Sequence, residues 1–454
     1  MSGRYQVAVI GSGSGGREAA LLAGRSGLRT AVIERAQIGG TSFHRGSYAV
    51  QALQGCARQF RDSWRSGRFG NQVDLLKATL HDWIVAQAQV SSRLSNGLKK
   101  EFRELNVDLL GGHAEFVDQQ TIQIVDSRGS KKTIAADNII IATGSRPEFY
   151  ASSTPRMVNS EELLRITTLP KSLVVIGAGY IGCEFASIYR TLGSEVTLIE
   201  RKERVLPKWE PEAGERVENP LREHGVRIIL NHDVSFPLAQ TTETQILIQG
   251  PDGTIIEADL VLVATGRKPN TENLRLDLVG IESDSFLKAD AQMRVRDNIY
   301  AVGDVNGISM LDSTTFSQAN VAIQSILGRK SAYDRRWIPC CVHTEPCLAS
   351  VGWSENEAAA ARMEYLVVSD QISAASDSKQ SVVNPEQTFI KIIIDAKTHH
   401  LLGCLVAGDH APAIVNIAAI AMKSGLTVED LCEMALVQPS ASEALIGTLR
   451  KVRL

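Results

Sequence analysis

One glycine pattern that occurs twice constrains the fold of this chain more than any other feature. In the first copy, residues 7–35 read VAVIGSGSGGREAALLAGRSGLRTAVIER, an apolar strand followed by a turn, a helix and a second strand. Gly11, Gly13 and Gly16 have the spacing G-x-G-x-x-G, in which the glycines allow a tight turn, the approach of a pyrophosphate and close helix packing. Glu34 ends the second strand, where a carboxylate accepts from a ribose hydroxyl. This segment therefore predicts a dinucleotide-binding fold.

The second copy spans residues 172–201, SLVVIGAGYIGCEFASIYRTLGSEVTLIER. Gly177, Gly179 and Gly182 repeat the spacing, and Glu200 ends the next strand. A carboxylate at that strand end pairs with the free 2′-hydroxyl of NAD and repels the 2′-phosphate of NADP. We therefore expect NAD(H) rather than NADP(H) at this site, although the two basic residues after Glu200 weaken the preference.

Two dinucleotide folds in one chain indicate a flavin and a nicotinamide held face to face, because hydride transfer requires both in a fixed geometry. Three further apolar strands agree, since each ends in a glycine-containing turn that can present backbone N–H groups to a cofactor: NIIIATGSRP (138–147), LVLVATGRKPN (260–270) and NIYAVGDVNG (298–307). Asp304 follows the last strand and is placed to accept hydrogen bonds from a polyol. A turn-forming aspartate is the alternative interpretation.

The composition is that of a globular protein with several domains, because 454 residues exceed what one hydrophobic core usually organises. The 48 basic and 51 acidic residues nearly balance, which argues against nucleic acid or a membrane as a partner. No apolar run is long enough to span a bilayer, and the N-terminus soon enters a strand-like run, so we expect a cytoplasmic location. The seven cysteines lack C-x-x-C spacing and suit reduced, mostly buried thiols. No metal site is expected.

Together these motifs resemble the class I pyridine nucleotide-disulfide oxidoreductases, the family of dihydrolipoamide dehydrogenase, glutathione reductase, mercuric reductase and soluble pyridine nucleotide transhydrogenase. The resemblance covers nearly the whole chain, since IPCCVHTEPCLASVGWSENEA (338–358) and residues 389–431 are similar to the family's interface domain. It implies an α/β fold with two Rossmann-like dinucleotide-binding domains, for FAD and NAD(P), plus an α+β C-terminal dimerisation domain. It also implies a homodimer that reacts with a small-molecule electron acceptor.

The family pattern divides the chain into four segments. Residues 1–147 and 271–335 would form the FAD-binding domain, residues 148–270 the NAD(P)-binding domain, and residues 336–454 the interface domain. Apolar residues at helical spacing predict a long helix within residues 73–107. An Asp-Gly hairpin is predicted in GPDGTIIEADLVLV (250–263), and a polar loop or hairpin over residues 369–387.

The resemblance also implies which residues contact the cofactors. The expected cofactor-binding residues are Gly11, Ser12, Gly13, Gly16, Glu34, Arg35, Gly40, Thr41, Ala114, Thr143, Gly144, Ser145, Gly177, Gly179, Ile181, Gly182, Glu200, Gly266, Asp304, Leu311 and Thr315. In the family pattern, Tyr180 would gate the nicotinamide side and Glu184 would orient the carboxamide.

The chain departs from the family at the reaction centre. After the glycine pair at 39 and 40 the family has a C-x-x-x-x-C motif, but Ser42 and Ser47 occupy the two cysteine positions here. A serine hydroxyl cannot cycle between thiol and disulfide. The family's lysine near the flavin falls at Gln51, so its ion pair with Glu184 is missing. We expect Glu184, if buried, to be partly neutral or held by Gln51.

The proton-transfer group of the family is also replaced. Its histidine base, contributed across the dimer, falls at Gln438, and an amide cannot shuttle a proton near neutral pH. Glu443, which orients that base in the family, still fits. Four positions that serve one reaction therefore differ together: Ser42, Ser47, Gln51 and Gln438.

His44 lies between the two serines, in a loop SFHRGS that is similar to the soluble transhydrogenase version. It is then the one imidazole predicted close to the flavin, where it could protonate a reduced acceptor or hold an anion together with Arg45. The alternative is a loop histidine that packs against the ring or is exposed. Ser313 replaces a family histidine near the flavin, while Thr314 and Thr315 can still cap a helix.

The leading hypothesis is an FAD-dependent NAD(P)H oxidoreductase that passes electrons from NADH through FAD directly to an acceptor, without a protein disulfide. The acceptor would be a quinone, a second pyridine nucleotide or another small molecule. One alternative is a catalytically degenerate flavoprotein with a binding or regulatory role. Another is dihydrolipoamide dehydrogenase-like activity that uses other thiols, such as Cys183. A Cys340–Cys341 disulfide would be strained, because neighbouring strand residues point to opposite faces.

Overall fold

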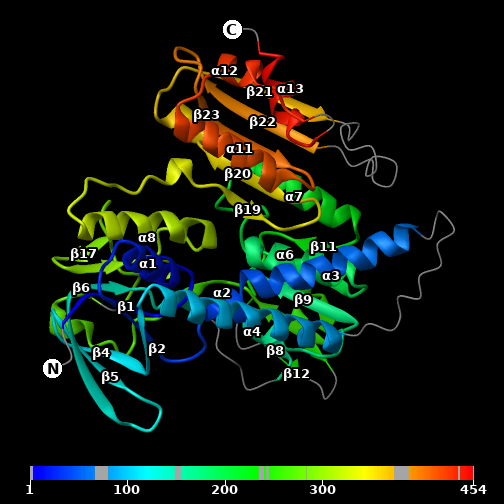
Figure 1. Ribbon diagram of the computed structural model, residues 1–454. Helices are drawn as coiled ribbons and strands as arrows, with labels where there is room; N and C mark the ends of the chain where they lie inside the picture. The colour runs from blue at the N-terminus through cyan, green and yellow to red at the C-terminus, as the bar shows by residue number, and fades with distance from the viewer. Residues whose placement is uncertain are drawn as a thin grey trace.

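A computed structural model describes residues 4–66, 80–148, 155–234, 240–241, 245–282, 284–372, 388–437 and 440–452. In these ranges the chain forms two α/β domains and an α+β domain that packs against both of them (Figure 1). This arrangement confirms the predicted fold class. The segment boundaries at residues 147, 270 and 335 stay predictions.

The first domain is built on an eight-stranded sheet in the order β17-β18-β6-β1-β2-β3, with β4 and β5 attached beyond β6. Its central strands are parallel, apolar and buried on both faces, because helices pack on one face and the β4–β5 hairpin packs on the other. The chain returns to this sheet late, because β18 pairs with β6. The strands are β1 (Tyr5–Ile10), β2 (Thr30–Glu34), β3 (Asp108–Gly111), β4 (His113–Asp118), β5 (Thr121–Val125), β6 (Lys131–Ile141), β17 (Arg294–Arg296) and β18 (Ile299–Ala301).

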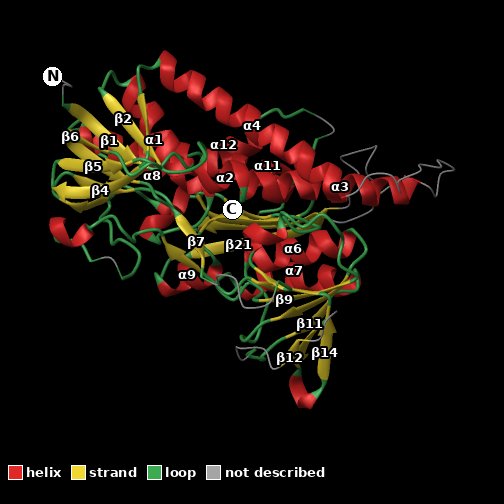
Figure 2. Cartoon of the chain, turned by 90° about the horizontal axis from the view of Figure 1, so that it is seen from below, coloured by secondary structure: helices red, strands yellow, loops and turns green. Residues whose placement is uncertain are grey.

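The helices of the first domain join segments far apart in the sequence. Helix α1 (Ser14–Arg25) packs against α8 (Asp312–Ile326), while α2 (Gly40–His44) leads into α3 (Ser47–Ser66). The helix predicted within residues 73–107 is present as α4 (Leu80–Glu104). Residues 73–79 of the predicted range lie outside the described part of the chain. Helices α3 and α4 contact each other and extend past the sheet (Figure 2).

The second domain has a five-stranded parallel sheet in the order β11-β10-β9-β15-β8, with α6 and α7 packed beside it (Figure 2). The predicted Asp-Gly hairpin is present, because β13 and β14 pair in antiparallel fashion around a short 3₁₀ turn, Pro251–Gly253. The elements are β8 (Met157–Val158), α5 (Ser160–Leu163), β9 (Ser172–Ile176), α6 (Tyr180–Thr191), β10 (Glu195–Ile199), α7 (Pro211–Glu223), β11 (Arg227–Ile229), β12 (Gln240–Thr241), β13 (Ile246–Gln249), β14 (Ile255–Ala258) and β15 (Leu260–Val263). Two short strands, β7 (Ser145–Pro147) and β16 (Arg267–Pro269), connect the two α/β domains.

The third domain is an antiparallel sheet, β19-β20-β23-β22-β21, covered by α11. The apolar face of α11 is buried against β20 and β23. The elements are β19 (Cys340–Val342), β20 (Leu348–Gly352), α9 (Glu355–Ala360), β21 (Tyr365–Ile372), β22 (Thr388–Asp395), β23 (Leu401–Ala407), α11 (Ala411–Ser424), α12 (Val428–Glu433) and α13 (Glu443–Leu449). Most of the loop predicted over 369–387 lies outside the described residues; its first four residues belong to β21.

Two features are absent from the described residues. No helix within them has the length and apolar character needed to cross a membrane. Nor does the described part of the chain bring together three or more His, Cys, Asp or Glu side chains that could hold a metal ion.

Candidate active site

The first glycine loop has the geometry that a dinucleotide requires. A Cβ atom on Gly16 would lie 2.0 Å from the carbonyl oxygen of Gly11, so only glycine lets α1 begin this close to β1. A Cβ on Gly13 would meet nothing within 4 Å, which leaves open space in front of the loop. The Glu34 carboxylate accepts from the backbone N–H of Ser12 at 2.9 Å and from its hydroxyl at 2.6 Å. The loop is therefore fixed while its outer side stays free for a ligand.

The second loop repeats this geometry. A Cβ on Gly182 would lie 1.9 Å from the Gly177 carbonyl oxygen, and the Cβ side of Gly179 is again open. Glu200 is buried and accepts from the Ala178 backbone N–H at 2.7 Å. Each α/β domain therefore carries one complete nucleotide-binding loop.

A cavity of about 460 Å³ is lined by residues of all three domains. Predicted site residues that line it are Gly11, Gly13, Glu34, Arg35, Gly40, Thr41, Ser42, Ser47, Gln51, Ala114, Thr143, Gly144, Ser145, Tyr180, Ile181, Glu184, Asp304 and Leu311. Predicted site residues that do not line it are Ser12, Gly16, His44, Gly177, Gly179, Gly182, Glu200, Gly266, Thr315 and Glu443. Gln438 lies outside the described residues.

Two polar groups in the cavity fit a bound dinucleotide. The hydroxyl of Thr143 is buried and has no hydrogen-bond partner among the described residues, so a ligand could supply one. Asp304 follows β18, and its carboxylate accepts a hydrogen bond from the Ser145 hydroxyl at 2.6 Å. The same carboxylate forms an ion pair with Arg267 at 3.8 Å. Burial raises the pKa of Asp304, and a further hydrogen-bond donor would stabilise its charged form. The residues present therefore fit FAD.

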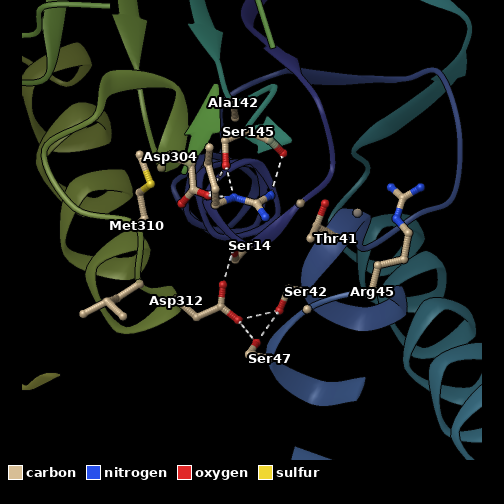
Figure 3. Close-up of a pocket in the computed structure, with 18 of the residues that line it drawn as sticks. Ser14, Thr41, Ser42, Arg45, Ser47, Ala142, Ser145, Asp304, Met310 and Asp312 are labelled. Carbon is tan, nitrogen blue, oxygen red and sulfur yellow. Dashed lines mark hydrogen bonds and ion pairs between the residues drawn. The ribbon is translucent and has the colours of Figure 1, made fainter. Parts of the chain in front are cut away.

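The positions of the family's cysteines hold a hydroxyl and carboxylate cluster (Figure 3). The Ser42 hydroxyl donates to Oδ2 of Asp312 at 2.5 Å, and the Ser47 hydroxyl donates to the same oxygen. The two serine oxygens are 3.3 Å apart, and Ser14 donates to the other carboxylate oxygen of Asp312 at 2.8 Å. The sequence analysis did not identify Asp312. One signal was available: Asp312 is an acidic residue at the start of α8, and it directly follows Leu311, a predicted site residue that also lines the cavity.

The opposite wall of the cavity carries the predicted nicotinamide-side residues and a histidine that was not predicted. The Glu184 carboxylate accepts from the backbone N–H of His343 at 2.8 Å, and burial raises the pKa of Glu184 to about 7. Nε2 of Gln51 lies 3.2 Å from Nε2 of His343, so Gln51 contacts that ring. The Tyr180 hydroxyl donates to the Met310 carbonyl oxygen at 3.2 Å, and burial raises its pKa. The burial of Glu184 agrees with the expectation that this carboxyl group is partly neutral. The alternative expectation was that Gln51 holds Glu184, but Gln51 contacts His343.

The predicted place of His44 beside the flavin is wrong. Its Nε2 lies 3.0 Å from the Ile38 carbonyl oxygen and 3.1 Å from the hydroxyl of Ser95 on α4, away from the cavity. The short helix α2 explains this, because Ser42 and His44 project from different sides of it. Arg45, the next residue, does line the cavity and pairs with Glu161 at 3.3 Å.

Two further expectations need correction. The hydroxyls of Thr314 and Thr315 donate to the carbonyls of Leu311 and Asp312, both at 2.7 Å, and do not cap the N-terminus of α8. Cys183 is fully buried, donates to the Ala178 carbonyl, and has a pKa raised by that burial. A thiol held in this protonated state is a poor redox nucleophile.

Glu443 begins α13, where its Oε2 accepts from the Ser440 backbone N–H at 3.1 Å. Within this chain it therefore stabilises its own helix terminus. Its expected catalytic role across a dimer stays a prediction.

Two nucleotide-binding loops, a cavity shared by three domains and a C-terminal sheet domain define an oxidoreductase class that combines FAD with a pyridine nucleotide. The chain belongs to the pyridine nucleotide-disulphide oxidoreductase family, whose pattern it matches over residues 5–325. Residues 338–448 match the dimerisation domain of the same family, which supports a homodimer. Family membership implies FAD and a pyridine nucleotide as cofactors.

Similar proteins agree with this assignment. The chain is 30% identical over 453 residues to a dihydrolipoyl dehydrogenase of Chlorobaculum tepidum, covering 98% of this chain and 96% of that protein. It is 32% identical over 452 residues to dihydrolipoyl dehydrogenase 3 of Pseudomonas aeruginosa, covering 97% and 96%. Among solved structures, LpdA of Mycobacterium tuberculosis superposes with a TM-score of 0.91 at 25% identity, covering 99% of this chain and all of that one. The Cu(II) complex of the HOCl-induced flavoprotein disulfide reductase RclA of Escherichia coli superposes with a TM-score of 0.86 at 27% identity, with the same coverage.

Proposed function

We propose that this protein is an FAD-dependent NADH oxidoreductase that passes electrons directly to a small-molecule acceptor, without cycling a disulfide at the family's usual place. The observation that carries this proposal is the cluster of Ser42, Ser47 and Asp312, which puts three oxygen-bearing side chains where the family has two sulfur atoms. None of these groups can form a disulfide or a thiolate.

The residues of the first domain would bind FAD, which supplies two-electron chemistry between a nicotinamide and an acceptor. The open side of the Gly11–Gly16 loop faces the place of a pyrophosphate, at the N-terminus of α1 where the helix dipole favours negative charge. Glu34, at the end of β2, would accept a hydrogen bond from a ribose hydroxyl. Asp304, which lines the cavity, would accept hydrogen bonds from the polyol chain of FAD. The unpartnered hydroxyl of Thr143 would gain a hydrogen bond from the cofactor.

The nicotinamide would lie on the wall formed by Tyr180, Glu184, Gln51 and His343. In its ionised form, Glu184 can accept a hydrogen bond from a carboxamide, and His343 already fixes one of its oxygens. Tyr180 at the start of α6 would move to admit the ring, the gating role that the family resemblance assigns to it. Glu200 favours NADH over NADPH, since its negative charge would repel a 2′-phosphate.

The acceptor would approach the wall that carries Asp312. The negative charge of this carboxylate contributes to the raised pKa values of both Asp304 and Tyr180, so its field reaches across the cavity. An anionic acceptor would be repelled there, whereas a neutral acceptor such as a quinone would not. The Ser42 and Ser47 hydroxyls, hydrogen-bonded to Asp312, can pass a proton between that carboxylate and a reduced oxygen atom. We further propose a homodimer located in the cytoplasm.

An anaerobic titration with NADH tests the proposal. Holoenzyme is first treated with dithiothreitol and desalted, so that every cysteine is reduced. We expect the visible flavin absorbance to be lost after one two-electron equivalent of NADH per subunit and to return on addition of a neutral quinone. Dihydrolipoamide and NAD⁺ should give no turnover. A flavin inert to NADH would favour a binding or regulatory protein, and uptake of two equivalents would favour a second redox group.

A further inference from the structure

A second group of reactive side chains lies at the turn between β19 and β20. Cys341 pairs with Ala349 across the two antiparallel strands, and Cys347 precedes Ala349 by two residues. Cys347 is buried in the apolar cluster of the third domain, and Cys341 packs against the same cluster. His343 lies between them in the sequence. The proposed electron transfer uses neither cysteine.

A guanidinium group contacts Cys347. Nη2 of Arg58, on α3, donates to the Cys347 sulfur at 2.9 Å. Arg58 is held in turn by an ion pair with the buried carboxylate of Glu345, which also pairs with Arg61. A fixed guanidinium of this kind stabilises a thiolate more than a thiol.

The protonation states follow from these contacts. A hydrogen bond from the Cys341 thiol, together with His343 and Arg58, lowers the pKa of Cys347 against the effect of burial. The same hydrogen bond raises the pKa of Cys341. The Arg58 guanidinium at 2.9 Å favours a thiolate on Cys347 and leaves the proton of the pair on Cys341, the combination found where one cysteine attacks and a second resolves.

One member of the pair opens onto the cavity. Cys341 and His343 both line it, while Cys347 is 1% exposed and does not line it. A thiol this buried favours the smallest oxidants, so the reagent class is hydrogen peroxide and comparably small hydroperoxides.

We propose that Cys341 and Cys347 form an oxidisable thiol pair that reacts with a small hydroperoxide and closes to a disulfide. The Cys347 thiolate attacks the peroxide, an S–O bond forms, the O–O bond breaks, and the leaving oxygen takes a proton from solvent. The Cys341 sulfur then displaces the hydroxyl from Cys347, which leaves as water with the Cys341 proton. Two thiols and one hydroperoxide thus give one disulfide, one alcohol or water molecule, and one further water molecule.

Closure of the disulfide would alter the nicotinamide wall. The Cys347 sulfur would lose its negative charge and with it the charge attraction of Arg58, and the turn that carries His343 would tighten. His343 holds Glu184 through its backbone N–H and contacts Gln51 through its ring. We therefore expect the oxidised protein to bind NADH more weakly. This inference goes beyond the proposed function, which requires no disulfide for turnover.

The test uses dithiothreitol-reduced, desalted holoenzyme and one equivalent of hydrogen peroxide. After denaturation and alkylation, peptide mapping should show five alkylated cysteines out of seven and one dithiothreitol-sensitive cross-link between Cys341 and Cys347. Cys341→Ser should stop at a sulfenic acid on Cys347 that dimedone traps. Cys347→Ser should lose the reaction, whereas the control Cys56→Ser, on α3 and with a pKa raised by burial, should behave as wild type.

Two outcomes would overturn the pair: seven free thiols after peroxide treatment, or a cross-link that involves any other cysteine. Failure of Cys347→Ser to fold would leave the dimedone adduct in Cys341→Ser as the deciding measurement, and absence of that adduct would also overturn it. NADH affinity, measured by equilibrium titration of oxidised and reduced protein, should differ several-fold. A cross-link with unchanged NADH affinity would overturn the effect on the nicotinamide wall. None of these results depends on turnover with an acceptor.

Discussion

The hydroxyl oxygen of Ser42 lies 2.5 Å from Oδ2 of Asp312, although the two residues are 270 positions apart in the sequence. The contact joins α2 to the first turn of α8 and closes the wall of the cavity where the family has its disulfide. The Asp312 carboxylate receives three hydroxyl hydrogen bonds, from Ser14, Ser42 and Ser47. The place of the family's two sulfur atoms is therefore taken by hydroxyl groups that are bound to a carboxylate.

Restoring the cysteines should restore a disulfide only if this charge is removed. The Ser42 and Ser47 oxygens are 3.3 Å apart, a separation that two sulfur atoms could close to a bond after small side-chain rotations. We expect the triple variant Ser42→Cys, Ser47→Cys, Asp312→Ala to take up two equivalents of NADH in anaerobic titration, against one for wild type. Ser42→Cys alone should still take up one equivalent. Uptake of one equivalent by the triple variant would contradict the assigned position of the serines.

Asp312→Asn should change the choice of acceptor. Removal of the negative charge should raise kcat/KM for an anionic quinone sulfonate about tenfold relative to a neutral quinone, equivalent to ~1.4 kcal/mol. The rate of flavin bleaching by NADH should change less than about twofold, because a free-energy difference of only a few tenths of a kcal/mol is expected on the nicotinamide side. Stopped-flow and steady-state measurements separate the two effects.

The matched control is Asp137→Asn, which removes an exposed carboxylate outside the cavity. It should leave the acceptor preference unchanged. Equal effects of the two substitutions would show that overall charge, and not the cavity wall, governs the choice.

Glu184 should make the stability of the protein depend on pH. Its pKa is raised by burial to about 7, above the ordinary value of 4.5, so the folded state binds this proton more tightly than the unfolded state. Its contribution is fully present below the unfolded pKa and is lost as pH rises through 7. Between pH 6 and 8 the loss should be on the order of 1 kcal/mol. Thermal melting at these pH values should show the decrease in wild type and a smaller one in Glu184→Gln.

The sequence predicted the two nucleotide-binding loops because each of their residues has a local task. Gly16 and Gly182 admit one close backbone contact each, and Glu34 and Glu200 end the next strand. Such features depend on short segments, so their spacing alone is informative. The same reasoning failed for His44, because the direction of a side chain on the five-residue helix α2 is decided by packing against α4.

Asp312 and His343 were missed for a related reason. Each comes into the cavity from an element distant in sequence, and no local spacing connects Asp312 with Ser42 or His343 with Glu184. The Cys347 sulfur likewise contacts Arg58, which lies on α3 in another domain. Contacts of this kind require the tertiary structure.

Glu200 should control the choice between NADH and NADPH. Its carboxylate is fixed by the backbone N–H groups of Ala178 at 2.7 Å and Lys202 at 3.0 Å, so its charge cannot move away from an incoming 2′-phosphate. We expect Glu200→Ser to lower the ratio of kcat/KM for NADH to that for NADPH about tenfold or more, or ~1.4 kcal/mol. The exposed Glu203→Ala is the control and should leave the ratio nearly unchanged. An unchanged ratio in Glu200→Ser would contradict the assignment.

Lys391 should stabilise the contact between the second and third domains. Its buried ammonium group, 4% exposed, lies 2.7–2.9 Å from carboxylates of Glu210 and Glu212 at the start of α7 and of Glu355 in α9. Lys391→Met would leave these carboxylates clustered without their cation, which should cost about 3–5 kcal/mol and lower the melting temperature by several degrees. Lys397→Met, which breaks an exposed pair with Glu364, is the control and should cost less than about 1 kcal/mol. Equal melting temperatures for the two variants would show that the buried cluster adds nothing to the stability of the domain contact.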